Sequence, residues 1–272
     1  MKVVELAGGV GGAKLAEGLA THLGSELTVV VNTGDDLDLY GLAIWPDHDT
    51  VAYTLAGLDD EVRGWGLRDE TWTVMAGLAA LGDDPWFRLG DRDLGTHLWR
   101  TDRLRAGSRP TAVALELRER LGFAATILPM ADEPVRTEVR TDDGWLEFQE
   151  YFVHRHQAPD VHDVRFRGIE AGLQTARSRG APAIAVSGIV GGRALKGPAD
   201  RMLVSLGHES SALGVARLYA EWVDTFVIDT IDADLAPAIQ ALGLRVVVTD
   251  TIMTDDAART RLAGDVLRAA IP

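Results

Sequence analysis

A strand, a glycine-rich turn, a helix and a second strand follow one another in the first 31 residues, and this order constrains the fold more than any other feature. Residues 1–7 are apolar, residues 8–12 read Gly-Gly-Val-Gly-Gly, and residues 13–23 carry leucines at helical spacing. Residues 27–31 are rich in valine, which is typical of a strand. The pattern predicts a right-handed βαβ unit, which begins a parallel sheet.

The rest of the chain alternates between helix and strand signals. The predicted helices cover residues 71–81, 96–106, 111–120 and 254–270, and the predicted strands cover residues 183–187, 226–229 and 245–250. Thr254 is the predicted N-cap of the last helix. Residues 135–140 and 145–153 flank an Asp-Gly turn and predict a β-hairpin. We therefore expect an α/β fold with a Rossmann-like parallel sheet flanked by helices. We expect one domain over residues 1–272, with a helical and hairpin insertion over residues 60–155.

The composition excludes several classes of function. The chain contains no cysteine, so it has no disulfide, zinc–thiolate site or thiol nucleophile. Its net charge of −14 repels the phosphates of nucleic acids and anionic membranes, so we expect neither as a partner. No apolar run approaches the roughly 20 residues that span a bilayer, and no signal peptide precedes the first strand. We therefore expect a cytoplasmic protein.

The glycine turn is a candidate phosphate site. Gly8, Gly9, Gly11 and Gly12 allow the backbone to approach an anion, and the helix that follows directs its N–H groups at that anion. Lys14 adds a positive charge in the first turn of the predicted helix. The spacing fits neither the dinucleotide fingerprint nor a Walker loop. A tight turn that serves only helix–sheet packing is the alternative.

Acidic residues are concentrated after the second strand. Asn32, Asp35 and Asp36 end that strand, and Asp47 and Asp49 follow in the segment Pro-Asp-His-Asp-Thr. Carboxylates beside a phosphate suit Mg²⁺, which prefers oxygen ligands. The sequence therefore predicts a Mg²⁺ site here, although a helix cap or a turn is the alternative for any single aspartate.

Other clusters could also bind a substrate. Asp91 and Arg92 precede a predicted helix, which Asp91 is expected to cap, and His97 is either functional or a satisfied buried histidine. Glycines at 191 and 192 followed by Lys196 repeat the strand–glycine–lysine pattern and could hold a second phosphate. Four tryptophans are more typical of a core, although the helical insertion offers a wall for a planar ligand: Trp65, Trp72, Trp86 and Trp99.

Several segments together resemble the 2-phospho-L-lactate transferases of coenzyme F420 biosynthesis, in order and over nearly the whole chain. They are Gly-Gly-Val-Gly-Gly-Ala-Lys-Leu (8–15), Asn-Thr-Gly-Asp-Asp (32–36), Pro-Asp-His-Asp-Thr-Val (46–51), Leu-Gly-Asp-Arg-Asp (89–93), Ile-Leu-Pro-Met-Ala-Asp-Glu-Pro-Val (127–135), Phe-Gln-Glu-Tyr-Phe (148–152) and Gly-Gly-Arg-Ala-Leu-Lys-Gly-Pro-Ala-Asp (191–200).

The resemblance implies a reaction and its residues. The ribityl hydroxyl of the deazaflavin Fo attacks a phosphorus of a guanosine diphosphate-linked lactate or enolpyruvate, and GMP leaves. It implies that Asp49 and Arg88 hold Fo and that Asp36 binds the metal, Mg²⁺, with Asp49. Asp49 is also the best candidate for the general base. The other predicted substrate contacts are Gly8, Gly9, Gly11, Gly12, Lys14, Asn32, Asp91, Arg92 and Lys196. Relatives are often homodimers, so a homodimer is expected.

One segment of the family pattern is missing. A Pro-Ser-Asn-Pro stretch with its own strand is expected before residue 191, but this sequence passes directly from Ala171 to Gly172. Either the chain has lost part of its nucleotide site or the sequence is closed over a deleted segment, and the intact flanking motifs favour the second.

The sequence leaves two alternative functions. A regulatory protein of a related family that binds nucleotide sugars shares the glycine turn and the Asn-x-x-Asp-Asp segment, whereas Asp49 with Arg88 favours the transferase. An NAD-dependent dehydrogenase would need a small residue at position 14. The composition, rich in Ala, Arg and Gly, is typical of a high-GC bacterium, for which the resemblance implies enolpyruvate as the donor group, and lactate stays the alternative.

Overall fold

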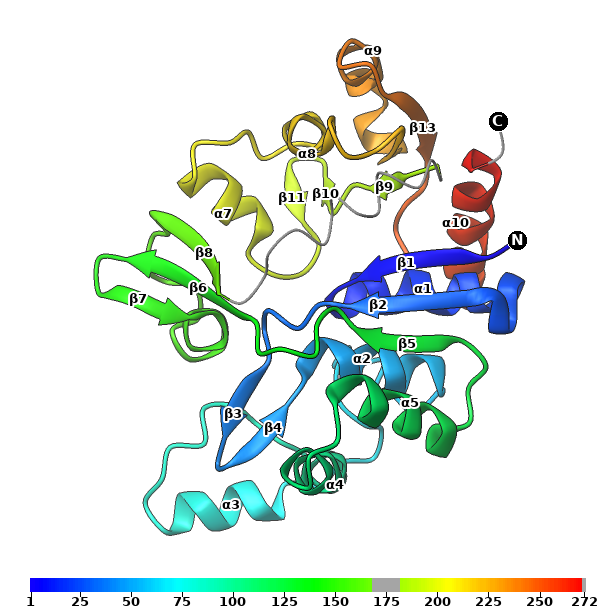
Figure 1. Ribbon diagram of the computed structural model, residues 1–272. Coiled ribbons are helices and arrows are strands. Elements are labelled where there is room, and N and C mark those ends of the chain that lie inside the picture. Colours follow the sequence, from blue (N-terminus) through cyan, green and yellow to red (C-terminus); the bar gives the residue numbers. More distant parts are fainter. Residues whose placement is uncertain (168–181, 271–272) are drawn as a thin grey trace. The chain divides into compact units, whose positions relative to one another are not determined.

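The computed structural model describes residues 1–167 and 182–270 (Figure 1). These residues form two compact units. The first contains residues 1–139, 145–158 and 164–167, and the second contains residues 140–144, 159–163 and 182–270. The junction of Ala171 and Gly172 lies outside the described residues.

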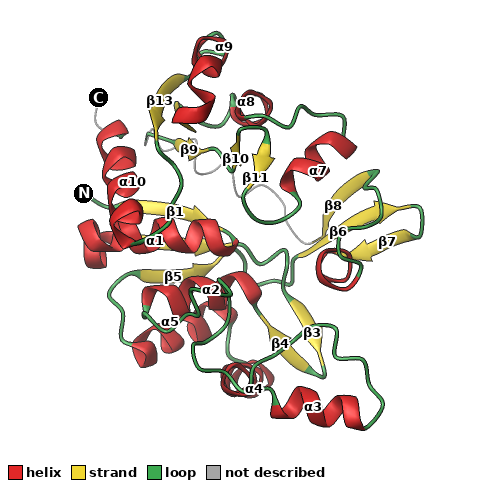
Figure 2. Ribbon diagram, turned by 180° about the vertical axis from the view of Figure 1, so that it is seen from behind, coloured by secondary structure: helices red, strands yellow, loops and turns green. Residues whose placement is uncertain are grey.

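The first unit is built on the predicted βαβ pattern. Strands β1 (Val3–Ala7), β2 (Leu27–Val31) and β5 (Thr126–Pro129) are parallel and lie in the order β1-β2-β5. Helix α1 (Gly9–Leu23) and the short 3-10 turn η1 (Gly24–Glu26) connect the first two strands. Helices α1, α2 (Pro46–Leu55) and α5 (Pro110–Leu121) cover one face of this sheet (Figures 1 and 2). The βαβ prediction is confirmed.

The two faces of strand β1 differ in burial. Val4 and Leu6 are each 64% exposed, whereas Ala7 is buried on the face that the helices cover. Glu5 lies on that same buried face, beside Val29 of β2, and is 7% exposed. Within the described residues, neither of its carboxylate oxygens has a hydrogen-bond partner. Burial raises the pKa of Glu5 from 4.5 to about 8.

We expect the Glu5→Gln variant to be more stable than the wild type above pH 8. The folded protein holds the Glu5 proton up to a pKa of about 8, whereas the unfolded chain releases it near 4.5. The wild type therefore loses stability as pH rises through this window, by an amount on the order of 2–4 kcal/mol. Urea unfolding at pH 5 and pH 9 measures the difference, with the exposed Glu26→Gln as control. The same pH dependence in wild type and Glu5→Gln would contradict the assignment.

A second set of elements packs around an apolar core in the first unit. It comprises β3 (Leu37–Leu39), β4 (Leu42–Ile44), α3 (Thr73–Ala80) and α4 (Asp91–Arg105). The buried side chains of this core are Leu37, Ile44, Met75, Leu89 and Leu94. The predicted helices over 71–81, 96–106 and 111–120 are confirmed as α3, α4 and α5, but α4 begins five residues earlier than predicted.

The predicted hairpin forms, but its second strand is shorter than predicted. Strands β6 (Arg136–Thr141), β7 (Gly144–Glu147) and β8 (Asp163–Arg167) form a sheet in the order β7-β6-β8. The predicted strand over 145–153 ends at Glu147, and a π-helical turn, η2, follows at Glu150–His154. The reason is a helical spacing of aromatic residues, because Phe148 and Phe152 stack with their centroids 5.7 Å apart.

The second unit has its own parallel sheet. Strands β9 (Ile184–Val186), β12 (Thr225–Asp229) and β13 (Arg245–Thr249) confirm the three predicted strands and lie in the order β13-β12-β9. Its core contains Phe226, Ile228 and Ile239. The other elements are β10 (Ile189–Val190), β11 (Arg193–Ala194), α7 (Ala199–Ser205), α8 (Ala212–Tyr219), η3 (Thr230–Leu235), α9 (Ala236–Gln240) and α10 (Asp256–Ala269).

The last helix is capped by a different residue from the one predicted. Asp255, rather than Thr254, is the N-cap of α10, and its carboxylate accepts the N–H of Ala258 at 2.8 Å. A carboxylate also complements the positive end of the helix dipole, which a hydroxyl does less well.

The fold class is therefore the predicted one, a mixed α/β fold with parallel sheets, flanking helices and antiparallel hairpins. One domain over residues 1–272 and an insertion over residues 60–155 stay predictions. No helix in residues 1–167 or 182–270 is long and apolar enough to cross a membrane.

Candidate functional site

The glycine turn lies between β1 and α1. Gly8 is extended and is the N-cap of α1, and Gly9 has a φ of +60°, a conformation that favours glycine. A Cβ on Gly12 would lie 2.9 Å from the Cβ of Ala7, so Gly12 allows the helix to pack closely on the strand. Lys14 lies in the second turn of α1 instead of the predicted first turn, because the helix begins at Gly9 and not at residue 13.

An aspartate of the protein covers this turn. The Asp47 carboxylate accepts the backbone N–H of Gly9 and, at 2.9 Å, the side-chain amide of Asn32. A Cβ on Gly8 would lie 3.2 Å from the Asp47 carboxylate, so the turn and the aspartate are in close contact. Burial raises the pKa of Asp47, and these hydrogen bonds oppose the rise. The helix N-terminus therefore holds a carboxylate at the place where the sequence predicted a phosphate.

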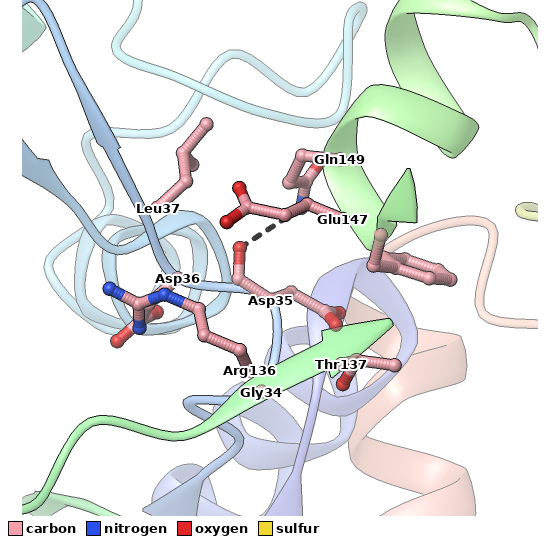
Figure 3. Close-up of a pocket in the computed structure, with 9 residues that line it drawn as sticks. Gly34, Asp35, Asp36, Leu37, Arg136, Thr137, Glu147 and Gln149 are labelled. Atoms are coloured by element: carbon pink, nitrogen blue, oxygen red, sulfur yellow. Dashed lines mark hydrogen bonds between the residues drawn. The ribbon is translucent and has the colours of Figure 1, made fainter. Parts of the chain in front are cut away.

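Two more carboxyl groups lie at the end of β2, where a small pocket opens (Figure 3). Asp35 and Asp36 line the pocket. Its other lining residues come from the same loop, from the start of β3, and from β6, β7 and the turn after β7: Gly34, Leu37, Arg136, Thr137, Glu147, Phe148 and Gln149. Burial, and then the charge of Asp47, raise the pKa of Asp35 to about 7.

Asp36 is the more deeply buried of the pair, at 9% exposure. Burial raises its pKa well above the usual range, although Arg100 and then Arg136, which lies beside it in Figure 3, oppose the rise. Its Oδ1 atom has no hydrogen-bond partner within residues 1–167 and 182–270. A buried carboxylate oxygen without a donor is the kind of ligand that a hard divalent cation such as Mg²⁺ takes, so the chemistry of Asp36 is compatible with one.

Asp49 lies in a different environment, a buried network of charges between α2 and α4. Its carboxylate contacts the guanidinium of Arg100, which is fully buried, and lies 3.5 Å from His48 and 3.6 Å from His97. Burial would raise the pKa of Asp49, but Arg100 and the histidines outweigh burial and lower the pKa to about 2. Asp49 is therefore ionised and already balanced by positive charge.

The same network contains three residues with the donor atoms that a metal ion would need. Donor atoms of Asp49, Asp93 and His97 lie within 4.8 Å of one another. His97 is 1% exposed and lies 3.4 Å from Asp93, whose carboxylate also accepts the hydroxyl of Tyr53 at 2.6 Å. Since Arg100 contacts both Asp49 and His97, a guanidinium already supplies the charge that a metal would supply here.

Asp91 does not cap α4 as predicted. It is the first residue of α4, and its carboxylate accepts the N–H groups of Thr73 and Val74, at 2.9 and 3.0 Å, at the start of α3. The N-terminus of α4 is capped instead by Glu70, whose carboxylate accepts the N–H groups of Arg92 and Asp93, each at 2.8 Å. Asp91 of α4 thus caps α3, and Glu70, which precedes α3, caps α4, a long-range arrangement that local sequence does not reveal.

The predicted basic residues are distributed over both units. Arg88 stacks on Trp72, with its guanidinium 4.3 Å from the ring centroid, and Arg92 donates a hydrogen bond to the carbonyl of Arg68. Lys196 belongs to the second unit, where it is exposed. There the N–H of Gly191 donates to the carboxylate of Asp232 at 3.0 Å, so this second glycine turn also holds an aspartate.

Comparison with known proteins decides the family. The family model of 2-phospho-L-lactate transferase CofD matches residues 3–190. The chain belongs to the CofD family. The resemblance seen in the sequence is thereby confirmed, and the chain is a CofD-type transferase of coenzyme F420 biosynthesis.

Members of both named activities are similar over nearly their full length. The chain is 36% identical to the phosphoenolpyruvate transferase of Kitasatospora aureofaciens, with 97% of each chain covered. It is 34% identical to the 2-phospho-L-lactate transferase of Methanosarcina acetivorans, with 96% of each covered. A solved Bacillus halodurans protein of the upf0052 family shares the fold, with a TM-score of 0.57 at 13% identity and 98% of each chain covered.

This CofD-family chain is shorter than the relatives it matches. The alignment with the Kitasatospora protein has 316 positions, whereas the chain has 272 residues, so the relative contains residues that this chain lacks. The missing segment was expected between Ala171 and Gly172, and its position stays a prediction.

The predicted site residues of this CofD-family member divide into groups. Asn32, Asp36 and the glycine turn lie with Asp47, which belongs to the predicted acidic cluster but not to the substrate and metal residues that the resemblance implies. Asp49 pairs with Arg100, and the only sequence signal for this was helical spacing of Asp93, His97 and Arg100, which places all three on one face of α4. Glu70 was missed.

Proposed function

We propose that this protein transfers a phospholactyl or phosphoenolpyruvyl group from a guanosine diphosphate-linked donor to the ribityl hydroxyl of Fo. The hydroxyl oxygen forms a bond to the phosphorus that carries the lactyl or enolpyruvyl group, the bond from that phosphorus to GMP breaks, and the hydroxyl proton leaves. The observation that carries the proposal is a group of carboxyls with little exposure beside the glycine turn, Asp35 and Asp36 after β2 and Asp47 in the first turn of α2. Phosphoryl transfer needs positioning and charge neutralisation above all, and such a site provides both.

Asp36 is the residue that we assign to Mg²⁺, with Asp49 and Asp47 close enough for their charges to raise its pKa. When bound, Mg²⁺ would neutralise the charge on the transferring phosphates. The unpartnered Oδ1 of Asp36 supports this assignment, as does the repulsion from Asp49 and then Asp47, which a cation would relieve. Asp49, the second ligand predicted from the sequence, is balanced by Arg100 without a metal.

Asp49 and Arg88 hold Fo in this proposal. The Oδ2 atom of Asp49 lies 3.6 Å from His97 Nδ1 but accepts no hydrogen bond in the part of the chain that the structure describes, and we assign this acceptor to a substrate hydroxyl. A carboxylate with a pKa of about 2 is a poor acceptor of a proton at neutral pH. We therefore propose that Asp49 orients the hydroxyl, and its role as general base stays a prediction. A homodimer is likewise proposed, to be measured by sedimentation.

Titration with Fo, followed by its absorbance or fluorescence, tests the proposed function. We expect Fo to bind, and to bind more tightly when Mg²⁺ and GDP are both present, because the carboxyl group needs the cation to accept a phosphate. Binding of GDP or a nucleotide sugar without any response to Fo would contradict the proposal and favour the regulatory function.

A further inference from the structure

Two tryptophans and two arginines form a compact patch in the loop between α2 and α3 and in the segment before α4. The rings of Trp65 and Trp72 meet edge to face, with centroids 6.2 Å apart. The guanidinium of Arg63 lies 5.6 Å from the Trp65 centroid and 5.2 Å from the Trp72 centroid, and that of Arg88 lies 4.3 Å from the Trp72 centroid. We call these four residues the Trp65 patch.

Contacts of Trp72 and Arg63 with neighbouring residues hold the patch in place. Trp72 packs against the apolar core that contains Met75 and Leu89. Arg63 is fixed by an ion pair with Asp60 at 2.9 Å and by a hydrogen bond to the carbonyl of Leu67 at 2.7 Å. These contacts fix one side of the Trp65 ring, yet the residue remains 40% exposed.

The exposed indole of Trp65 lies against the Arg63 guanidinium, and the Arg88 guanidinium lies over the neighbouring Trp72 ring. Arginine over an aromatic ring and a free aromatic face are the features with which proteins bind flat, electron-rich or anionic ring systems. The patch is also connected to the site. Arg92, in the first turn of α4, contacts the carbonyl of Arg68 in the patch's loop, while His97 of the same helix contacts Asp49.

We propose that Trp65 is the aromatic wall of the acceptor site, against which the fused rings of the deazaflavin stack, with Arg63 and Arg88 beside them. This inference rests on the proposed function, since it concerns the same acceptor. Trp72 holds the Trp65 ring in place by its edge-to-face contact and, in this proposal, does not touch the ligand. The ribityl chain then extends from the rings toward Asp49.

The test is the Kd for Fo of the wild type and of three variants, with Mg²⁺ and GDP present. Trp65→Ala is expected to raise the Kd about tenfold, since stacking on one aromatic side chain contributes on that scale. Trp65→Phe, which keeps a ring, is expected to stay within about threefold of the wild type. The matched control is Trp145→Ala, because Trp145 is also exposed, at 36%, and also carries an arginine, Arg165, 3.9 Å from its ring centroid. The Kd for GDP should be unchanged in all of them.

The outcomes separate this inference from the proposed function. A wild type that binds Fo, with a Trp65→Ala variant within twofold of it, would overturn the aromatic wall and leave the function standing. A wild type that does not bind Fo would overturn both. If the Trp65→Ala variant does not fold, the quenching of tryptophan fluorescence by Fo tests the inference instead. Bound Fo should quench the tryptophan emission of the wild type more than that of Trp65→Phe, and equal quenching would overturn the inference.

Discussion

The Asp36→Asn variant is expected to transfer the phosphoryl group to Fo about 10²–10³-fold more slowly than the wild type. The change removes the buried carboxylate that we assign to Mg²⁺, and a cation that stabilises phosphoryl charge contributes several kcal/mol to the barrier. The measurement is the initial rate of GMP release at saturating Mg²⁺ and Fo.

The stability of the same variant separates this role from a structural one. Burial raises the pKa of Asp36, so the folded protein gains nothing from the charged form, and the amide should be tolerated without loss of melting temperature. The control is Asp38→Asn, two residues along the chain, whose side chain is 75% exposed and which should keep the wild-type rate. A folded Asp36→Asn protein with the wild-type rate would remove Asp36 from the metal site.

The Arg100→Met variant is expected to lose about 3–5 kcal/mol of unfolding free energy. Arg100 is fully buried, pairs with Asp49 and lies 4.4 Å from the ring centroid of Trp45, so methionine leaves Asp49 buried without its counter-charge. Chemical denaturation measures the loss. Asp49→Asn in the same chain removes that uncompensated charge, so the double variant should recover part of the stability.

Arg103→Met is the matched control for this prediction. Arg103 lies on the same helix and pairs with Glu116, but its side chain is 26% exposed and its partner's 38% exposed, so its loss should cost at most about 1 kcal/mol. An Arg100→Met protein as stable as Arg103→Met would show that the buried network does not hold α2 against α4.

Local patterns were enough to predict the parallel strands and the helices, because apolar periodicity and glycine turns are properties of short segments. The strands over 183–187, 226–229 and 245–250 were each found within about two residues. The start of α4 was misplaced because its cap, Glu70, comes from 20 residues before Gly90, and a Cβ on Gly90 would lie 2.1 Å from that side chain. The turn after β7 was misjudged because its aromatic residues suit a strand as well as a helix.

The sequence was enough to predict the types of residue in the candidate site, but not which residues they contact. The sequence pointed to Asp36 and Asp49 together, but tertiary packing gives them opposite electrostatics. Asp36 is buried with a raised pKa, whereas Arg100, 51 residues from Asp49, lowers the pKa of Asp49. The contact of Asp47 with the glycine turn also depends on the path of β3 and β4, which no motif records.

The most direct test of the account is product formation. The protein would be incubated with Fo, Mg²⁺ and each guanosine diphosphate-linked donor in turn, and GMP and the Fo phosphoester would be quantified together. The account predicts GMP and phosphoester in equal amounts with at least one donor, and none without Fo or without Mg²⁺. A folded protein that binds Fo and GDP but releases no GMP with either donor would contradict it.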